Sequence, residues 1–193
     1  LTSNPTIFNH AIQKSSLYDA DIQRMGREES ETVFFQLAVA DPTRAADLFH
    51  PIYLVTNGVD GWVSIEVSPR LARDASATLT QVEQLHAMAV RPNMFVKIPG
   101  TPEGLTAIEN AIFAGLPINV TLLFSAEQYL ACAEAYMRGI ERRIDAGLNA
   151  HVPSVASVFI SRWDKATFGK TPVTFNNTLG IAVATHVYRA YQN

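Results

Sequence analysis

Lys97 is the residue whose type and position most directly suggest chemistry. The chain has four lysines, at positions 14, 97, 165 and 170, and Lys97 alone lies within an apolar run, residues 94–98. An unpaired ammonium is costly to bury, and burial lowers the pKa of a lysine from its usual value of about 10.4. A neutral amine attacks carbonyl carbons, so Lys97 could be a nucleophile that forms a Schiff base. The alternative is a structural lysine paired with a neighbouring carboxylate.

Glu66 lies in the preceding apolar run and supplies the carboxylate that both interpretations need. It could be the salt-bridge partner of Lys97, or a general acid and base that works through a water molecule. Three hydrogen-bonding residues occupy the apolar runs further along: Asn119, Thr121 and Ser157. These could bind a polyhydroxylated substrate or satisfy one another. Arg162 follows the last of these runs, where its planar guanidinium suits a phosphate or simply faces solvent.

Strands that alternate with helices must position these side chains. Short β-rich runs occur at residues 62–67, 94–98, 119–124 and 155–160. Helical periodicity follows the first two runs, at residues 74–89 and 102–115. Ser125 and Gln128 have the spacing of a capping box and should begin a third helix. A last helix should begin at about residue 178. Residues 7–49 have the pattern of several short helices. The alternation predicts right-handed βαβ units and a parallel sheet.

Polar residues within the strands favour a barrel over an open sheet. A parallel strand covered on both faces is apolar throughout, whereas these strands alternate. In residues 94–98 the apolar side chains share one face and Lys97 takes the other, and in residues 119–122 the apolar face belongs to Val120 and Leu122. The polar side chains thus converge near the carboxyl ends of the strands. Active sites of (β/α)₈ barrels lie there.

Composition excludes several classes of protein. The 193 residues are 48% hydrophobic and 17% charged, which predicts one folded domain. A net charge of −3 gives no electrostatic reason to bind nucleic acid or an anionic membrane. Cys132 is the lone cysteine, so no internal disulfide can form, and no Cys/His cluster has zinc-site spacing. No run approaches the roughly 20 apolar residues that cross a bilayer, and residues 1–5 lack the pattern of a signal peptide, so we expect a soluble, cytoplasmic protein.

Five segments, in order, resemble the successive strand motifs of transaldolase. They are Thr2-Ser3-Asn4-Pro5-Thr6-Ile7-Phe8, Val63-Ser64-Ile65-Glu66-Val67, Phe95-Val96-Lys97-Ile98-Pro99, Ile118-Asn119-Val120-Thr121-Leu122-Leu123-Phe124-Ser125 and Ser154-Val155-Ala156-Ser157-Val158-Phe159-Ile160-Ser161-Arg162. The match spans essentially the whole chain. Five motifs in register are far more specific than any one of them and favour the catalytic interpretation of Lys97.

The resemblance implies a (β/α)₈ barrel of the class I aldolase type that needs no metal or cofactor. It would transfer a dihydroxyacetone unit between sugar phosphates of the pentose phosphate pathway through a Schiff base. By the same resemblance, Lys97 is the nucleophile, Glu66 moves protons through a water that Thr121 positions, Asn4, Asn119 and Ser157 bind substrate, and Arg162 binds phosphate. The alternatives are a class I aldolase that releases dihydroxyacetone, and a catalytically silent fragment.

The chain also departs from the family pattern. A barrel has eight strands in about 250 residues, and this chain offers equivalents of the second to sixth strands. The family's first-strand aspartate and second phosphate-binding arginine are not found. We therefore expect residues 1–193 to be a single transaldolase-like barrel domain truncated at both ends, with open strand edges at Ile7 and Val155. Two segments further resemble the transaldolase part of proteins fused to a glucose-6-phosphate isomerase: Ser161-Arg162-Trp163-Asp164 and Leu179-Gly180-Ile181-Ala182.

Overall fold

Parallel strands in chain order form the sheet of this protein. The computed structural model describes residues 1–26 and 28–192. In this part of the chain, the strands are β1 (Val63–Glu66), β2 (Met94–Pro99), β3 (Ile118–Leu123) and β4 (Ser154–Val158). Each strand pairs in parallel with the next. A bridge from Thr2 to Ser64 places the N-terminal segment beside β1. The predicted parallel βαβ arrangement is confirmed.

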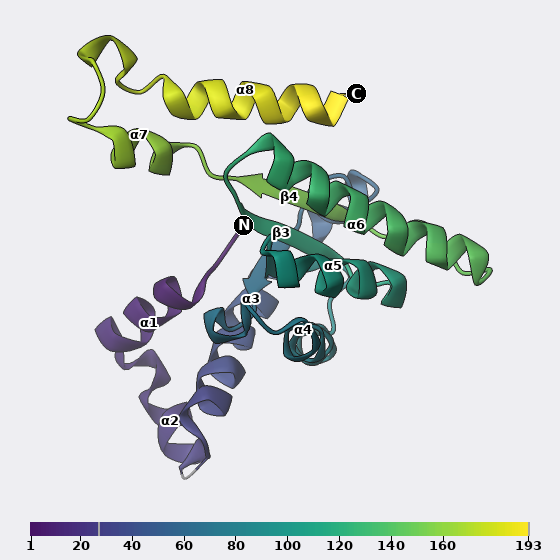
Figure 1. Ribbon diagram of the computed structural model, residues 1–193. Helices are drawn as coiled ribbons and strands as arrows, with labels where there is room; N and C mark the ends of the chain where they lie inside the picture. The colour runs from purple at the N-terminus through teal and green to yellow at the C-terminus, as the bar shows by residue number, and fades with distance from the viewer. Residues whose placement is uncertain (27, 193) are drawn as a thin grey trace.

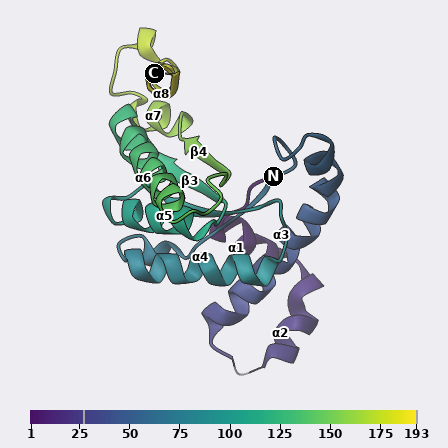
Figure 2. The ribbon, with the colours of Figure 1, turned by 90° about the vertical axis from the view of Figure 1, so that its right-hand side faces the viewer.

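Helices cover one face of this sheet. After β1, β2 and β3 come α4 (Ala75–Ala89), α5 (Pro102–Ala114) and α6 (Ala126–Asp145), and Figures 1 and 2 show these three helices side by side. The N-terminal helices are α1 (Pro5–Lys14), α2 (Asp19–Met25) and α3 (Ser30–Val55), and the C-terminal ones are α7 (Ser161–Thr167) and α8 (Leu179–Gln192). Short 3₁₀ turns occur at Ser16–Tyr18, Pro69–Leu71 and Val173–Phe175. No helix of the described residues is long and apolar enough to cross a membrane.

The starts of the covering helices follow the sequence signals. Asp74, Thr101 and Ser125 are N-caps whose side chains accept the backbone N–H three residues later. Pro102 begins α5, and Gly115 ends it in the left-handed conformation at φ 83°. Local sequence therefore sets where α4, α5 and α6 begin.

The N-terminal third differs from expectation in two ways. Instead of several short helices, it has two short ones and then the 26-residue α3, which continues through Pro42 and Pro51. A proline inside a helix removes one hydrogen bond, at a cost of about 3 kcal/mol. The buried face of α3, which includes Phe35 and Val39, packs into the core and offsets that cost. Ile7 lies in α1 and not on a strand edge, since Thr2 makes the bridge.

The core lies between the sheet and the helices. The apolar face of β2 is wholly buried there, and the face of α5 that meets it is equally buried: Met94, Val96, Ile98, Ala107, Ile108, Ala111 and Ile112. This burial leaves the opposite face of β2, and with it Lys97, on the inner side of the sheet. β4 is the last strand of this sheet, and Val155 on it is 44% exposed.

A bulge in β3 changes the predicted pattern of its apolar side chains. Residues Val120 and Leu123 pair with Ala156 and Val158, so β3 has one residue more than β4 between the two pairs. Leu122 takes up the extra length at φ 60°. As a result, Leu123 packs in the core, where the alternation of the sequence predicted Leu122.

Gly139 lets α6 approach α5 closely, and we expect Gly139→Ala to destabilise the protein. A methyl group there would lie 2.7 Å from Cβ of Ile112 and 2.8 Å from the carbonyl oxygen of Glu109. We expect overpacking to lower the free energy of unfolding by about 1 to 3 kcal/mol, although alanine favours a helix over glycine by about 1 kcal/mol. Urea titration measures the change. Glu134→Ala, at an exposed site of the same helix, should stay within about 0.5 kcal/mol, and an equally harmless Gly139→Ala would contradict the packing.

Candidate active site

Lys97 and Glu66 form a buried ion pair on the inner face of the sheet. They are neighbours in the register between β1 and β2, and Nζ of Lys97 donates to Oε2 of Glu66 at 3.1 Å. A second bond runs from the same nitrogen to the backbone oxygen of Ser3 at 3.3 Å. The two side chains are 8% and 16% exposed. The amine therefore points inward, within reach of the carboxylate of the preceding strand, as both interpretations of Lys97 require.

A chain of polar side chains lies beside this pair. Asn119 is the register neighbour of Lys97 on β3. Its Oδ1 accepts from the hydroxyl of Ser157 at 2.7 Å, and its Nδ2 donates to Oγ of Ser64 at 3.2 Å. Ser3 also donates its hydroxyl to the backbone oxygen of Ser64, at 2.8 Å. Asn119 is thus held in one orientation by partners from β1 and β4.

Ser64 and Ser3 are members of this network that the sequence analysis did not single out. The signal for Ser64 was present, because it shares the strand face of Glu66 two residues later. Ser3 could not be found in this way, since it lies in a bridge and not in a regular strand. Its carbonyl oxygen nevertheless contacts the lysine amine directly.

Thr121 occupies the inner face of β3 one step further towards the carboxyl end. It is 1% exposed, and its register partner on β2 is Pro99. Pro99 lies three residues before the first residue of α5. Its backbone oxygen accepts the N–H of Gly100 at 2.8 Å. Because Asn119 and Thr121 alternate with Val120, both side chains face the side of Lys97.

Asn4 and Arg162 make their contacts elsewhere. The Oδ1 of Asn4 caps α1 by accepting the N–H of Ile7 at 2.9 Å. The guanidinium of Arg162 is exposed in α7, 4.4 Å from the ring centre of Phe159. In the described parts of the chain, neither side chain hydrogen-bonds Lys97, Glu66 or Asn119. The structure brings five of the seven predicted residues, Lys97, Glu66, Asn119, Thr121 and Ser157, onto one face of the sheet, and it does not join Asn4 or Arg162 to them by a side-chain hydrogen bond in the described residues.

Aromatic rings close the inner face on the side of the strand starts. Phe95 precedes Lys97 by two residues on the same face, and its ring stacks on Trp62 with centres 4.0 Å apart and planes at 17°. Tyr53 of α3 meets the Trp62 ring edge-on at 5.2 Å. Apolar rings beneath an ion pair exclude water and strengthen its electrostatic interactions. Nothing in the spacing of these three residues indicated that they would meet.

In the described part of the chain, neither Cys132 nor a cluster of metal ligands offers a competing centre. Burial raises the pKa of the Cys132 thiol to about 11, so this side chain stays neutral in the core of α6. Among residues 1–26 and 28–192, no group of three or more His, Cys, Asp or Glu side chains could hold a metal ion.

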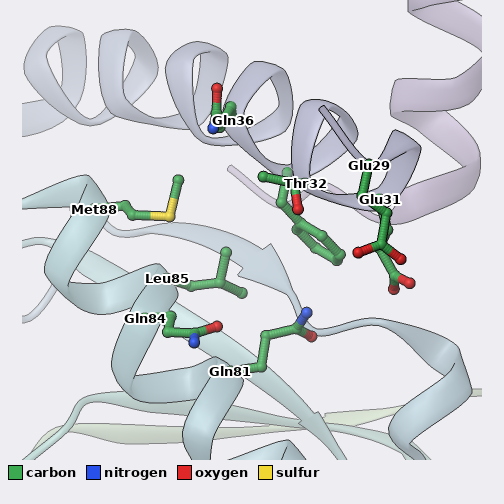
Figure 3. A pocket seen from close by; sticks show the side chains of 9 residues that line it. Glu29, Glu31, Thr32, Gln36, Gln81, Gln84, Leu85 and Met88 are labelled. Carbon is green, nitrogen blue, oxygen red and sulfur yellow. The ribbon is translucent and has the colours of Figure 1, made fainter. Parts of the chain in front are cut away.

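A hollow of about 300 Å³ lies elsewhere, between the first turns of α3 and the middle of α4. Figure 3 shows Glu29, Glu31 and Gln36 on one side of the hollow, and Met88, Leu85, Gln84 and Gln81 of α4 on the other. These residues belong to the helices and not to the inner face of the sheet. The hollow includes none of the residues around Lys97.

Comparison with known proteins assigns the family. A sequence model of the family described as "Transaldolase/Fructose-6-phosphate aldolase" matches residues 1–193. The chain belongs to this family. Its parallel sheet and covering helices are accordingly part of the (β/α)₈ barrel of the transaldolase family, which confirms the predicted fold class.

Several curated relatives are named transaldolase. The chain is 44% identical to one from Trichodesmium erythraeum over 168 residues, which are 85% of this chain and 44% of the relative. It is 39% identical to one from Thiobacillus denitrificans over 201 aligned positions, covering 99% of this chain and 56% of the relative. The chain is also 39% identical to one from Acidothermus cellulolyticus over 202 aligned positions, which cover 100% of this chain and 54% of the relative. The chain spans about half the length of the curated relatives it matches.

Proposed function

We propose that the protein containing this chain is a transaldolase that uses Lys97 as its nucleophile. The observation that supports this most is the buried amine of Lys97, 3.1 Å from the carboxylate of Glu66, on the polar inner face of a transaldolase-family barrel. A lysine with a purely structural role needs a carboxylate partner, but it does not need the adjoining hydrogen-bond network of Ser64, Asn119 and Ser157. That network suits the hydroxyl groups of a sugar.

The reaction begins when Lys97 passes a proton to Glu66 through a water molecule and adds to the C2 ketone of a ketose phosphate. Loss of water from the adduct gives an imine, which accepts the electron pair of the C3–C4 bond when that bond breaks. The C4 aldehyde leaves, and a three-carbon enamine stays on Lys97. The enamine then attacks the aldehyde of an acceptor sugar phosphate, and water releases the new ketose. Sedoheptulose 7-phosphate with glyceraldehyde 3-phosphate gives fructose 6-phosphate with erythrose 4-phosphate.

The other residues orient the substrate in this proposal. Glu66 takes and returns protons through the water, and Thr121 positions that water. Asn119, Ser157 and Asn4 hold hydroxyl groups of the dihydroxyacetone unit. Arg162, exposed after β4, binds the phosphate. The partners are therefore small sugar phosphates, no cofactor takes part, and we place the protein in the cytoplasm.

Borohydride trapping tests the proposal on the full-length protein. Incubation with fructose 6-phosphate and borohydride should reduce the enamine-derived imine, and peptide mapping should find a three-carbon adduct on Lys97. An adduct on another lysine with Lys97 unmodified would defeat the assignment. Lys165, exposed in α7, serves as the internal reference because a nonspecific reaction would label it equally.

A class I aldolase that releases dihydroxyacetone is the second candidate, since the family description includes fructose-6-phosphate aldolase. The first steps are shared, and only the fate of the enamine differs. We expect product to form much faster with an aldose phosphate acceptor present than without one. Equal rates of donor consumption with and without the acceptor would favour the aldolase.

A further inference from the structure

We propose that Gln128 of α6 is a positioning residue that holds Thr121 in place by fixing the bulge of β3. The inference rests on the function proposed above, in which Thr121 positions the water used by Glu66. Gln128 itself is placed outside the reacting groups, on the helix side of the strand ends.

The bulge is the feature that needs to be held. Leu122 lies at φ 60°, a conformation that a leucine adopts only where its surroundings impose it. The register shift occupies the stretch between Val120 and Leu123, and Thr121 lies inside it. A bulge re-aims the side chains beside it, so the direction of the Thr121 side chain depends on whether the bulge keeps its shape.

Gln128 bonds both sides of this bulge. Its Nε2 donates to the backbone oxygen of Leu122 at 3.0 Å, and its Oε1 accepts the N–H of Phe124 at 2.9 Å. These two groups flank Leu123, whose side chain is fully buried in the core. One side chain therefore hydrogen-bonds both the carbonyl before Leu123 and the amide after it.

The same side chain also fixes the end of β2. Nε2 of Gln128 donates to the backbone oxygen of Gly100 at 2.7 Å, and the N–H of Gly100 donates to the backbone oxygen of Thr121 at 2.8 Å. Gly100 follows Lys97 by three residues. Gln128 thus ties the strand that carries the nucleophile to the residue proposed to position the water.

This arrangement departs from an ordinary capping box. In that motif the side chain of the third helical residue returns to the N–H of the N-cap residue. Here Ser125 accepts the N–H of Gln128 as expected, but the Gln128 side chain passes the cap and bonds Gly100, Leu122 and Phe124. A glutamate would also complete a capping box, whereas only an amide can accept one bond and donate two here.

Two substitutions in the full-length enzyme test the role. Gln128→Glu keeps an acceptor for Phe124 but turns a second oxygen towards two carbonyl oxygens, and Gln128→Met removes all three bonds at similar length. We expect kcat to fall about 10- to 100-fold in both, with KM changed less than about 3-fold, because a misplaced group slows the reaction more than it weakens binding. The amount of trapped Lys97 adduct at saturation should stay that of the wild type. Gln84→Glu, the same change at an exposed site of α4, is the control and should match the wild type.

A double-mutant cycle separates positioning from a merely structural effect. If Gln128 acts through Thr121, then Gln128→Glu should change kcat less than about 3-fold in a Thr121→Ala background, because the group that it positions is already gone. Full additivity of the two losses would overturn the inference. The inference would also be overturned if circular dichroism showed that both Gln128 variants are largely unfolded while their remaining folded fraction kept the wild-type kcat.

The two proposals fail in different ways. If the wild-type enzyme forms no adduct on Lys97, the proposed function fails and the positioning role fails with it. If the wild type forms the adduct and the Gln128 variants turn over like Gln84→Glu, only the positioning role fails. Hydrogen exchange of residues 119–124, faster in Gln128→Met than in the wild type, supports the bulge independently of turnover, and unchanged exchange would count against it.

Discussion

Replacing Lys97 by methionine in the full-length protein should abolish the trapped three-carbon adduct and lower kcat/KM by at least about 1,000-fold. Loss of the nucleophile in other covalent enzymes costs as much or more, because binding and the remaining polar groups supply only part of the total rate enhancement. Methionine keeps an unbranched side chain in the buried site between β1 and β3, so the substitution removes the amine without opening a large cavity. Steady-state kinetics and mass spectrometry of the borohydride-treated protein measure the two effects.

Lys165→Met is the matched control, because this lysine is exposed in α7 and forms no part of the inner face. It should retain both the adduct and the wild-type rate. Lys97→Met also leaves Glu66 without its ion-pair partner, so the melting temperature should be measured alongside. An adduct that persists in folded Lys97→Met would show that another amine forms the Schiff base.

The sequence predicts the inner face of the sheet because two signals mark the same residues: the two-residue period of a strand, and the cost of burying a polar or charged side chain among apolar ones. Lys97 interrupts an otherwise apolar strand, and only a strand with one polar face explains both the lysine and its apolar neighbours. Glu66 then follows from the same alternation one strand earlier. The structure adds the register, which places these two residues side by side and Asn119 next to them.

The features that the sequence analysis missed depend on irregular backbone or on contacts between distant elements. The bulge at Leu122 breaks the period of two on which the strand pattern relies, and no glycine marks it. The stack of Trp62 on Phe95 joins residues that are far apart in the sequence. The passage of α3 through Pro42 and Pro51 reflects packing against the core, which outweighs a strong local signal.

Replacing Glu66 by glutamine should lower kcat about 100- to 10,000-fold, which is the usual range for loss of a general acid and base. Glutamine has the same shape, and its amide oxygen can still accept the bond from Lys97, so the position of the amine should change little. The amide cannot take up a proton, however, and both formation and hydrolysis of the imine need one to move. We therefore expect slow but eventually complete trapping of the Lys97 adduct, measured by mass spectrometry over time.

Glu134→Gln on the exposed face of α6 controls for the change of charge and should leave the rate unaltered. A second substitution, Glu66→Ala, distinguishes proton transfer from pairing, because it also removes the acceptor for the buried amine. It should destabilise the protein more than Glu66→Gln while slowing the reaction to a similar extent. If Glu66→Gln kept a rate within about 3-fold of the wild type, Glu66 would be the structural partner of Lys97, and the protons would have to pass through another group such as the hydroxyl of Thr121.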